Sequence, residues 1–362
     1  MIEYENLKRV NQKLFTEYED SFRALLDSGW YILGKQVDSF EKEFASYCGV
    51  KHCVGVASGL DALTIAINAF EFPVGSEVIV ASNTYIATII SILNNGLIPV
   101  LVEPDIQTYN IDTDKISEKI TDKTCAIIAV HLYGKICDMT AIMSLAQAHS
   151  LVVIEDAAQA HGASHKDKKA GSFGIGCFSF YPTKNLGALG DAGAILSHNK
   201  EYSDKIKWLR NYGSQEKYYN DYLGFNSRLD EIQAGFLSKK LKILDEINAH
   251  KRALAQVYFE NLSDKYIKPV LEKDNFDVYH IFNIRHEYRD SLKLYLLNQD
   301  IQTEIHYPVP PHEQKFVKNI IRQDYPISSL IHETTLSLPI SFFHTESDVL
   351  KVCETMNKWK KI

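Results

Sequence analysis

Residues 151–159 read LVVIEDAAQ, and in this stretch four apolar residues lead directly into Glu155 and Asp156. A short apolar run that ends in polar residues is typical of a buried strand in a parallel sheet. Asp156 then lies just past the carboxyl end of that strand, at the edge where open α/β sheets bind ligands. A carboxylate there can pair with a protonated ring nitrogen. The alternative is an ordinary helix cap in a strand-to-helix turn.

Similar apolar runs recur along the first half of the chain, with helical segments between most of them. They cover residues 53–57, 77–81, 98–102, 126–130 and 177–180. This alternation predicts βαβ units, a mainly parallel sheet and right-handed crossovers. Two helices are predicted before the first strand, because apolar residues recur at helical spacing over 5–28 and 37–47.

The pattern changes after Arg228. Long helices with charged faces are expected over 228–262, a strand over 279–286, and two further helices over 289–299 and 345–360. We therefore predict an α/β protein of two domains. The large α/β domain covers residues 1–245, and a smaller α+β domain covers residues 246–362.

Composition excludes several classes of protein. Hydrophobic residues make up 45% of the 362 residues, charged residues 23%, and the net charge is −7 without a basic run. A nucleic-acid partner is not expected, because phosphate binding needs clustered Lys and Arg. No membrane span or secretory signal is expected. The six cysteines form no CxxC pair, which predicts free thiols in the cytoplasm.

Residues 177–193 read CFSFYPTKNLGALGDAG, where a short apolar strand is followed by Lys184 in a segment rich in small residues. A lysine there can reach back to the edge of the sheet. Burial beside a cationic cofactor would lower its pKa and make the neutral amine available as a nucleophile. Ser179 precedes it by five residues and offers a hydroxyl to a phosphate. The alternative is a surface-loop lysine.

Residues 54–63 read VGVASGLDAL, in which a strand runs into Ser58-Gly59 and a helix opens at Leu60. Helix N-termini carry unpaired N–H groups and a positive dipole end, which suit a phosphate. Pyridoxal 5'-phosphate (PLP) requires a phosphate cradle, an acidic residue beside its ring nitrogen, a hydroxyl for the phosphate and a lysine, and these motifs together supply all four. A dinucleotide site does not fit, because no GxGxxG follows the first strand, and a P-loop is also absent.

Five separated motifs resemble the DegT/DnrJ/EryC1/StrS family of PLP-dependent sugar aminotransferases. They are SGLDAL, EDAAQAHGA, FSFYPTKNLGALGDAG, NSRLDEIQAG and IHYPVPPHEQ, and the similarity begins at about YILGKQVDSFEKEFA. The resemblance implies the aspartate-aminotransferase fold (fold type I), PLP as cofactor, and a homodimer with active sites at the interface. The stretch GSQEKYYNDYLGFNSRLDEIQA is most similar to enzymes that aminate C3 of a dTDP-linked 3-keto-6-deoxyhexose.

The resemblance also assigns roles by position. Lys184 matches the Schiff-base lysine, Asp156 the partner of the pyridine nitrogen, and Gln159 the residue near the ring hydroxyl. Tyr85, in ASNTYIAT, matches the aromatic residue that stacks on the ring. The expected phosphate contacts are Ser58, Gly59, Leu60, Ser179 and, from the other subunit, Asn226.

For the sugar nucleotide, the candidates are Tyr181, Lys217, Arg228, His306 and Tyr307. Arg228 as a brace for a helix start and His306 as a packed loop residue are the alternatives. His306 and His312 lack further ligands at metal spacing, so no metal site is expected.

The implied reaction moves an amino group from glutamate to the C3 keto group, giving a dTDP-3-amino-3,6-dideoxyhexose. Alternatives are amination of a 4-keto nucleotide sugar, a sugar dehydratase on the same fold, and a silent regulator that senses a sugar nucleotide. Lys184 stands where dehydratases of this kind carry histidine, which favours transamination. The intact set of Lys184, Asp156 and Gln159 disfavours the regulator.

Overall fold

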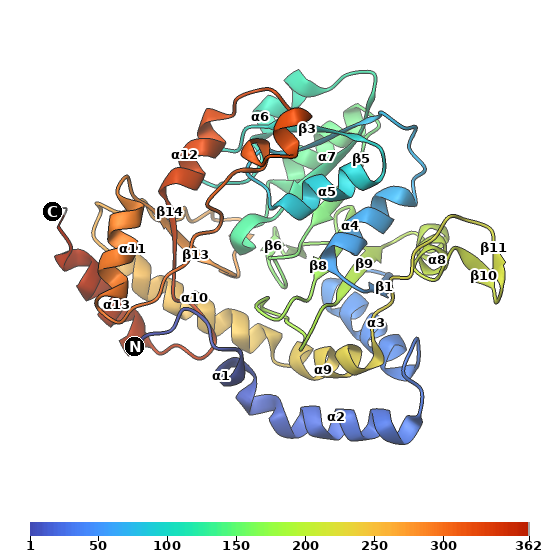
Figure 1. Cartoon of the computed structure of the whole chain (residues 1–362), viewed down its shortest axis with the longest axis horizontal. Coiled ribbons are helices and arrows are strands. Elements are labelled where there is room, and N and C mark those ends of the chain that lie inside the picture. The colour runs from blue at the N-terminus through green and yellow to red at the C-terminus, as the bar shows by residue number, and fades with distance from the viewer. Residues whose placement is uncertain (361–362) are drawn as a thin grey trace.

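A seven-stranded mixed sheet forms the centre of the computed structural model, which describes residues 1–360 (Figure 1). Its strand order is β1-β9-β8-β5-β4-β2-β3. The pairs from β8 to β3 are parallel, whereas β9 runs antiparallel to both of its neighbours. The strands are β1 His52–Val56, β2 Glu77–Ala81, β3 Ile98–Val102, β4 Thr124–Val130, β5 Val152–Asp156, β8 Ile175–Ser179 and β9 Gly193–Ser197.

Alternation along the strands explains how both faces of this sheet are covered. In β2, Ile79 packs into one hydrophobic cluster, whereas Val78 and Val80 pack into another on the opposite face. Such alternation follows from the two-residue period of a strand, and both sides are apolar because helices cover both. Helices α3, α7 and α9 supply the first cluster, and α4, α5 and α8 supply the second. The result is a three-layer α/β/α arrangement.

The helix predicted over 37–47 and helices between most of the predicted strands are present, the latter without predicted limits. They are α3 Lys35–Cys48, α4 Gly59–Asn68, α5 Ile86–Asn94, α6 Thr113–Ile116, α7 Met139–Ala148, α8 Lys200–Leu209 and α9 Glu231–Leu241. The predicted helix over 5–28 is confirmed in outline. It is divided into α1 Leu7–Asn11, a 3₁₀ turn and α2 Phe15–Ser28, which lies beside α9 at the bottom of Figure 1.

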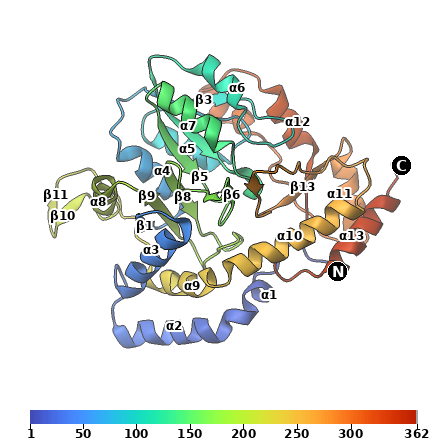
Figure 2. The same ribbon diagram turned by 180° about the vertical axis from the view of Figure 1, so that it is seen from behind.

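A third hydrophobic cluster lies at the other end of the molecule, near both termini (Figure 2). It gathers apolar residues between Leu254 and Trp359, together with Ile2 from the first residues of the chain. The elements there are α10 Leu244–Asn261, β13 Phe282–Arg285, α11 Arg289–Leu297, β14 Thr335–Leu338 and α13 Glu346–Lys358, whereas α12 Pro326–Thr334 packs against the second cluster through Ile331. The predicted elements over 228–262, 279–286, 289–299 and 345–360 are thus present, while the domain boundary at 245 remains a prediction.

Short strands missing from the prediction complete the fold. β9 is the seventh strand of the sheet and pairs antiparallel with β8, and the helix-free segment between these two strands carries Lys184. β6 Ser164–His165, β7 Lys168–Lys169 and β12 Asn275–Phe276 form a small separate sheet. β10 Ser214–Glu216 and β11 Tyr219–Asn220 form a hairpin that projects from the body in both views (Figures 1 and 2). Within residues 1–360, every helix is too short or too polar to cross a bilayer.

Candidate active site

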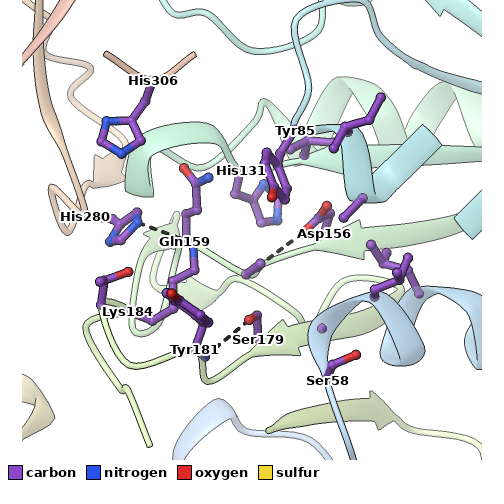
Figure 3. Close-up of a pocket in the computed structure, with 18 of the residues that line it drawn as sticks. Ser58, Tyr85, His131, Asp156, Gln159, Ser179, Tyr181, Lys184, His280 and His306 are labelled. Carbon is purple, nitrogen blue, oxygen red and sulfur yellow. Dashed lines mark hydrogen bonds between the residues drawn. The ribbon is translucent and has the colours of Figure 1, made fainter. Parts of the chain in front are cut away.

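The candidate site is a pocket of about 420 Å³ at the edge where the parallel strands end (Figure 3). Tyr85 follows β2, His131 follows β4, and Asp156 is the last residue of β5. Because these strands are parallel, their carboxyl ends meet along one edge of the sheet. The loop between β8 and β9 brings Lys184 to the same place.

Most of the predicted residues line this single pocket, although they come from distant parts of the sequence. They are Ser58, Gly59, Leu60, Tyr85, Asp156, Gln159, Ser179, Tyr181, Lys184, His306 and Tyr307. Three predicted residues, Lys217, Asn226 and Arg228, lie outside the pocket of their own chain. Lys217 is at the tip of the β10–β11 hairpin, and Asn226 is exposed. Arg228 donates to Asn211 Oδ1 at 2.9 Å.

Asp156 is buried and holds a fixed orientation. Its Oδ2 accepts a hydrogen bond from the Thr88 hydroxyl at 2.8 Å, and its Oδ1 accepts one from the Ala158 backbone N–H at 3.3 Å. Burial raises the pKa of Asp156, while the Thr88 hydroxyl, the Ala158 N–H and the charge of Lys184 oppose that rise. A turn follows β5 instead of a helix, so the helix-cap alternative is wrong.

Lys184 is partly buried in the pocket, and its Nζ lies 3.4 Å from Nε2 of His280. Burial lowers the pKa of Lys184 to about 8, against the opposing effect of the Asp156 carboxylate. A lysine of this kind has a much larger neutral fraction near physiological pH than an ordinary lysine, and the neutral amine is the nucleophile in covalent catalysis. The surface-loop alternative for Lys184 is therefore wrong.

The first turn of α4 and the end of β8 form a concave polar cradle. Ser58 caps α4, its Oγ accepting from the Asp61 N–H at 3.1 Å. A Cβ atom built on Gly59 would lie 2.5 Å from Ser179 Cβ, so only glycine permits this approach of helix and strand. Ser179 Oγ accepts from the Tyr181 N–H at 3.3 Å, which leaves its own hydrogen free to donate. Helix N–H groups and this hydroxyl suit a phosphate.

Gln159 ties the back of the pocket to the C-terminal part of the chain. Its Oε1 accepts from the Tyr133 backbone N–H at 2.6 Å, and its Nε2 donates to the Tyr307 hydroxyl at 3.0 Å. The Tyr307 ring packs against Tyr85, with centroids 4.9 Å apart. His306 donates to or accepts from the Ser337 hydroxyl through Nδ1 at 2.9 Å, and burial lowers its pKa to about 4.

The residues that sequence reasoning missed include His131 and His280, which line the pocket, and Thr88, which holds Asp156 from behind it. Thr88 lies one helical turn after Tyr85, so its position on α5 was a usable signal. His131 bonds to the fully buried Glu155 at 3.0 Å and follows a predicted strand. Nothing in the local sequence marks His280, which only the tertiary structure brings to Lys184.

The residues of the pocket fit pyridoxal phosphate. The cradle suits the phosphate, and the buried Asp156 suits the ring nitrogen. The low-pKa amine of Lys184 suits the aldehyde carbon, and Tyr85 suits the face of the aromatic ring. This agreement rests on the donor set and on the close approach at Gly59.

Comparisons with known proteins agree with this chemistry. The profile of the DegT/DnrJ/EryC1/StrS aminotransferase family matches residues 13–357. A dTDP-3-amino-3,6-dideoxy-alpha-D-galactopyranose transaminase from Aneurinibacillus thermoaerophilus is 50% identical over 361 residues, covering 99% of each chain.

Two solved structures are similar over nearly the whole fold. The crystal structure of Streptomyces venezuelae DesV in complex with a ketimine intermediate has a TM-score of 0.97 and 39% identity, covering 99% of this chain and 98% of that one. The crystal structure of NtdA from Bacillus subtilis, with bound PMP, has a TM-score of 0.91 and 31% identity, covering 98% and 84%.

Fold and site together define a PLP-dependent aminotransferase of fold type I. The chain belongs to the DegT/DnrJ/EryC1/StrS aminotransferase family.

Proposed function

We propose that the protein transfers the amino group of glutamate to the C3 keto group of a dTDP-linked 3-keto-6-deoxyhexose. The product is a dTDP-3-amino-3,6-dideoxyhexose. The observation that carries this proposal is one pocket that combines Lys184, Asp156 and the phosphate cradle, in a chain half identical to a dTDP-3-amino-sugar transaminase over its full length.

Each side chain then has a distinct role. Bound PLP supplies an electrophilic carbon and a ring that accepts electrons. The Lys184 amine would hold the cofactor and would move a proton at its Nζ. The Asp156 carboxylate, held by Thr88, would pair with the ring nitrogen and favour its protonated form. Tyr85 would cover a ring face, and Gln159 would lie near the ring hydroxyl.

The phosphate end is held by Ser58, Gly59, Leu60 and Ser179. Their advantage is that backbone N–H groups and a hydroxyl bind the dianion without a cation that would compete with the Lys184 amine. The sugar lies toward Tyr181, which is 52% exposed at the pocket, and toward His306 and Tyr307.

The proposal includes a homodimer with shared sites. Lys217, Asn226 and Arg228 lie outside the pocket of their own chain, on or next to a hairpin that projects from the body (Figures 1 and 2). In a two-fold dimer each projecting segment can complete the site of the other subunit reciprocally. Six free cysteines support an assignment to the reducing cytoplasm.

A product analysis tests the function. The purified enzyme, yellow with absorbance near ~420 nm, is treated with glutamate and then with a panel of nucleotide-linked 3-keto and 4-keto sugars. We expect glutamate to bleach the colour and the dTDP-3-keto sugars to restore it, with the amine at C3 by NMR. Amination at C4, or loss of preference for dTDP, would contradict the substrate assignment, and absence of bleaching would contradict glutamate as donor.

A further inference from the structure

His280 is the nearest hydrogen-bonding partner of the Lys184 amine in the structure. The distance from Lys184 Nζ to His280 Nε2 is 3.4 Å, and both residues line the pocket (Figure 3). The other ring nitrogen, Nδ1, is buried and has no partner within residues 1–360. A buried imidazole with one free nitrogen is costly to keep. Among the described residues, Nε2 is thus the one ring nitrogen of His280 with a hydrogen-bonding partner, and that partner is Lys184.

Hydrogen bonds join the segment that carries His280 to the loop that carries Lys184. Asn185, the next residue after the lysine, donates to the Val278 carbonyl at 3.0 Å. Lys251 of α10 donates both to Asn185 Oδ1 at 3.0 Å and to the His280 carbonyl at 3.1 Å. The imidazole and the amine are therefore held by one network, although 96 residues separate them in sequence.

We propose that His280 is a positioning residue whose neutral imidazole accepts a hydrogen bond from the Lys184 amine whenever that amine is not bonded to the cofactor. This inference rests on the proposed role of Lys184. With one N–H engaged by Nε2, the amine keeps its lone pair for the cofactor carbon or for a proton. His280 thus restricts the flexible Lys184 side chain to conformations near its reactive position.

The charges around His280 favour this direction of donation. Its cationic neighbours are Lys184 and Lys251, with His306 and His161 nearby, and burial with these groups holds its pKa well below the ordinary value. A neutral ring that accepts at Nε2 carries its hydrogen on Nδ1. His280 therefore acts as an acceptor only, and the proton moved during the reaction stays with the Lys184 amine.

Cofactor attachment provides the first test. PLP is removed from the full-length enzyme and added back in a stopped-flow instrument. The instrument separates non-covalent capture of PLP from the later growth of absorbance, which reports attachment of PLP to Lys184. His280→Phe should slow the attachment phase about tenfold, the effect of one lost hydrogen bond to the reacting amine, while capture stays nearly normal. His280→Gln, which keeps an acceptor, should recover most of the rate. The exposed His198 gives the control His198→Phe.

An attachment rate in folded His280→Phe equal to that of the unaltered enzyme would overturn the proposal. So would failure of His280→Gln to recover it, because the shape of the ring would then be what matters. If Lys184→Met still attaches PLP, the proposed role of Lys184 fails independently of His280.

A second measurement needs no change at His280. With ¹⁵N-labelled histidine, the Nε2 resonance of His280 is compared before and after glutamate converts the holoenzyme and frees Lys184. We expect an upfield shift typical of a nitrogen that gains a donor, and no such shift in Lys184→Met. Identical spectra before and after conversion would show that the amine does not donate to His280.

Discussion

Thr88 donates its hydroxyl hydrogen to Asp156 at 2.8 Å, and Thr84 lies 2.7 Å from the same hydroxyl. Since the Thr88 hydrogen is given to a carboxylate, the Thr84 hydroxyl is the donor in the second bond. Two threonines of the ASNTYIAT segment thus form a short relay that ends on the buried Asp156. The relay stabilises the ionised carboxylate in a place where burial favours the neutral acid.

Removing this hydroxyl should impair catalysis without unfolding the protein. In Thr88→Val, Asp156 loses its side-chain donor, so its pKa should rise further and the ring nitrogen should be protonated less firmly. We expect kcat to fall about tenfold, as for loss of one hydrogen bond to a charged group of about 1.5 kcal/mol. Thr88→Ser should retain most activity. Equal kcat values for Thr88→Val and the unaltered enzyme would show that the bond has no role in turnover.

Asp156→Asn should have a larger effect, because it keeps the shape but removes the charge. We expect kcat to fall by about two orders of magnitude or more, the size found for other preorganised charge partners, about 3 kcal/mol. The substitution should also lower the pKa of Lys184 further, since the Asp156 charge raises it. A spectrum of the bound cofactor that matches the unaltered enzyme, with an unchanged rate, would contradict the assignment.

Lys184 should react as an amine at unusually low pH. With a pKa of about 8 in place of 10.5, roughly half of the amine is neutral at pH 8, against roughly one part in 300 for an ordinary lysine. The neutral fraction grows with pH, so labelling of the cofactor-free enzyme by an amine reagent should rise through pH 8 and then level off. Mass spectrometry of the labelled peptides measures this, with the exposed Lys217 as internal reference. Labelling of Lys184 that is still rising at pH 10 would contradict the lowered pKa.

Lys184→Ala should abolish turnover.

Gly59→Ala should damage the phosphate cradle. Its new Cβ would meet Ser179 Cβ at 2.5 Å, which forces helix α4 away from β8 and costs about 1–3 kcal/mol. We expect the Kd for PLP to rise at least tenfold. The control is Gly29→Ala, at an exposed αL position with nothing within 4 Å of the new atom. That change should lower the stability by about 1 kcal/mol and leave the Kd unaltered. A similar Kd in both variants would argue against a cradle at Gly59.

Mixing two inactive variants tests the shared site. Lys184→Ala lacks the amine, and Asn226→Asp should be impaired because its carboxylate repels the phosphate. In heterodimers of the two, one of the two sites keeps both residues intact. Partial recovery of activity is therefore expected after subunit exchange, with exchange verified by native mass spectrometry. Verified exchange without recovery would place Asn226 in the site of its own chain.

Much of the fold was readable from the sequence because its signals are local. The apolar runs that became β2 and β3 match their predicted limits of 77–81 and 98–102, since strands buried on both faces must be continuously apolar. The strand-end place of Asp156 and the small-residue loop around Lys184 followed from the same patterns. The antiparallel β9 was missed because no helix precedes it and a short buried strand carries little periodic signal of its own.

Tertiary structure alone decided which distant groups act on one another. The sequence by itself determined the α/β class, the family and the residues Lys184, Asp156 and Ser58, because motif and strand pattern reside in contiguous stretches. It could not place His280 beside Lys184, since that contact joins residues 96 apart through the packing of Lys251 and Asn185. The lowered pKa of Lys184 has the same origin, because desolvation depends on what the folded chain packs around an amine and not on its neighbours in sequence.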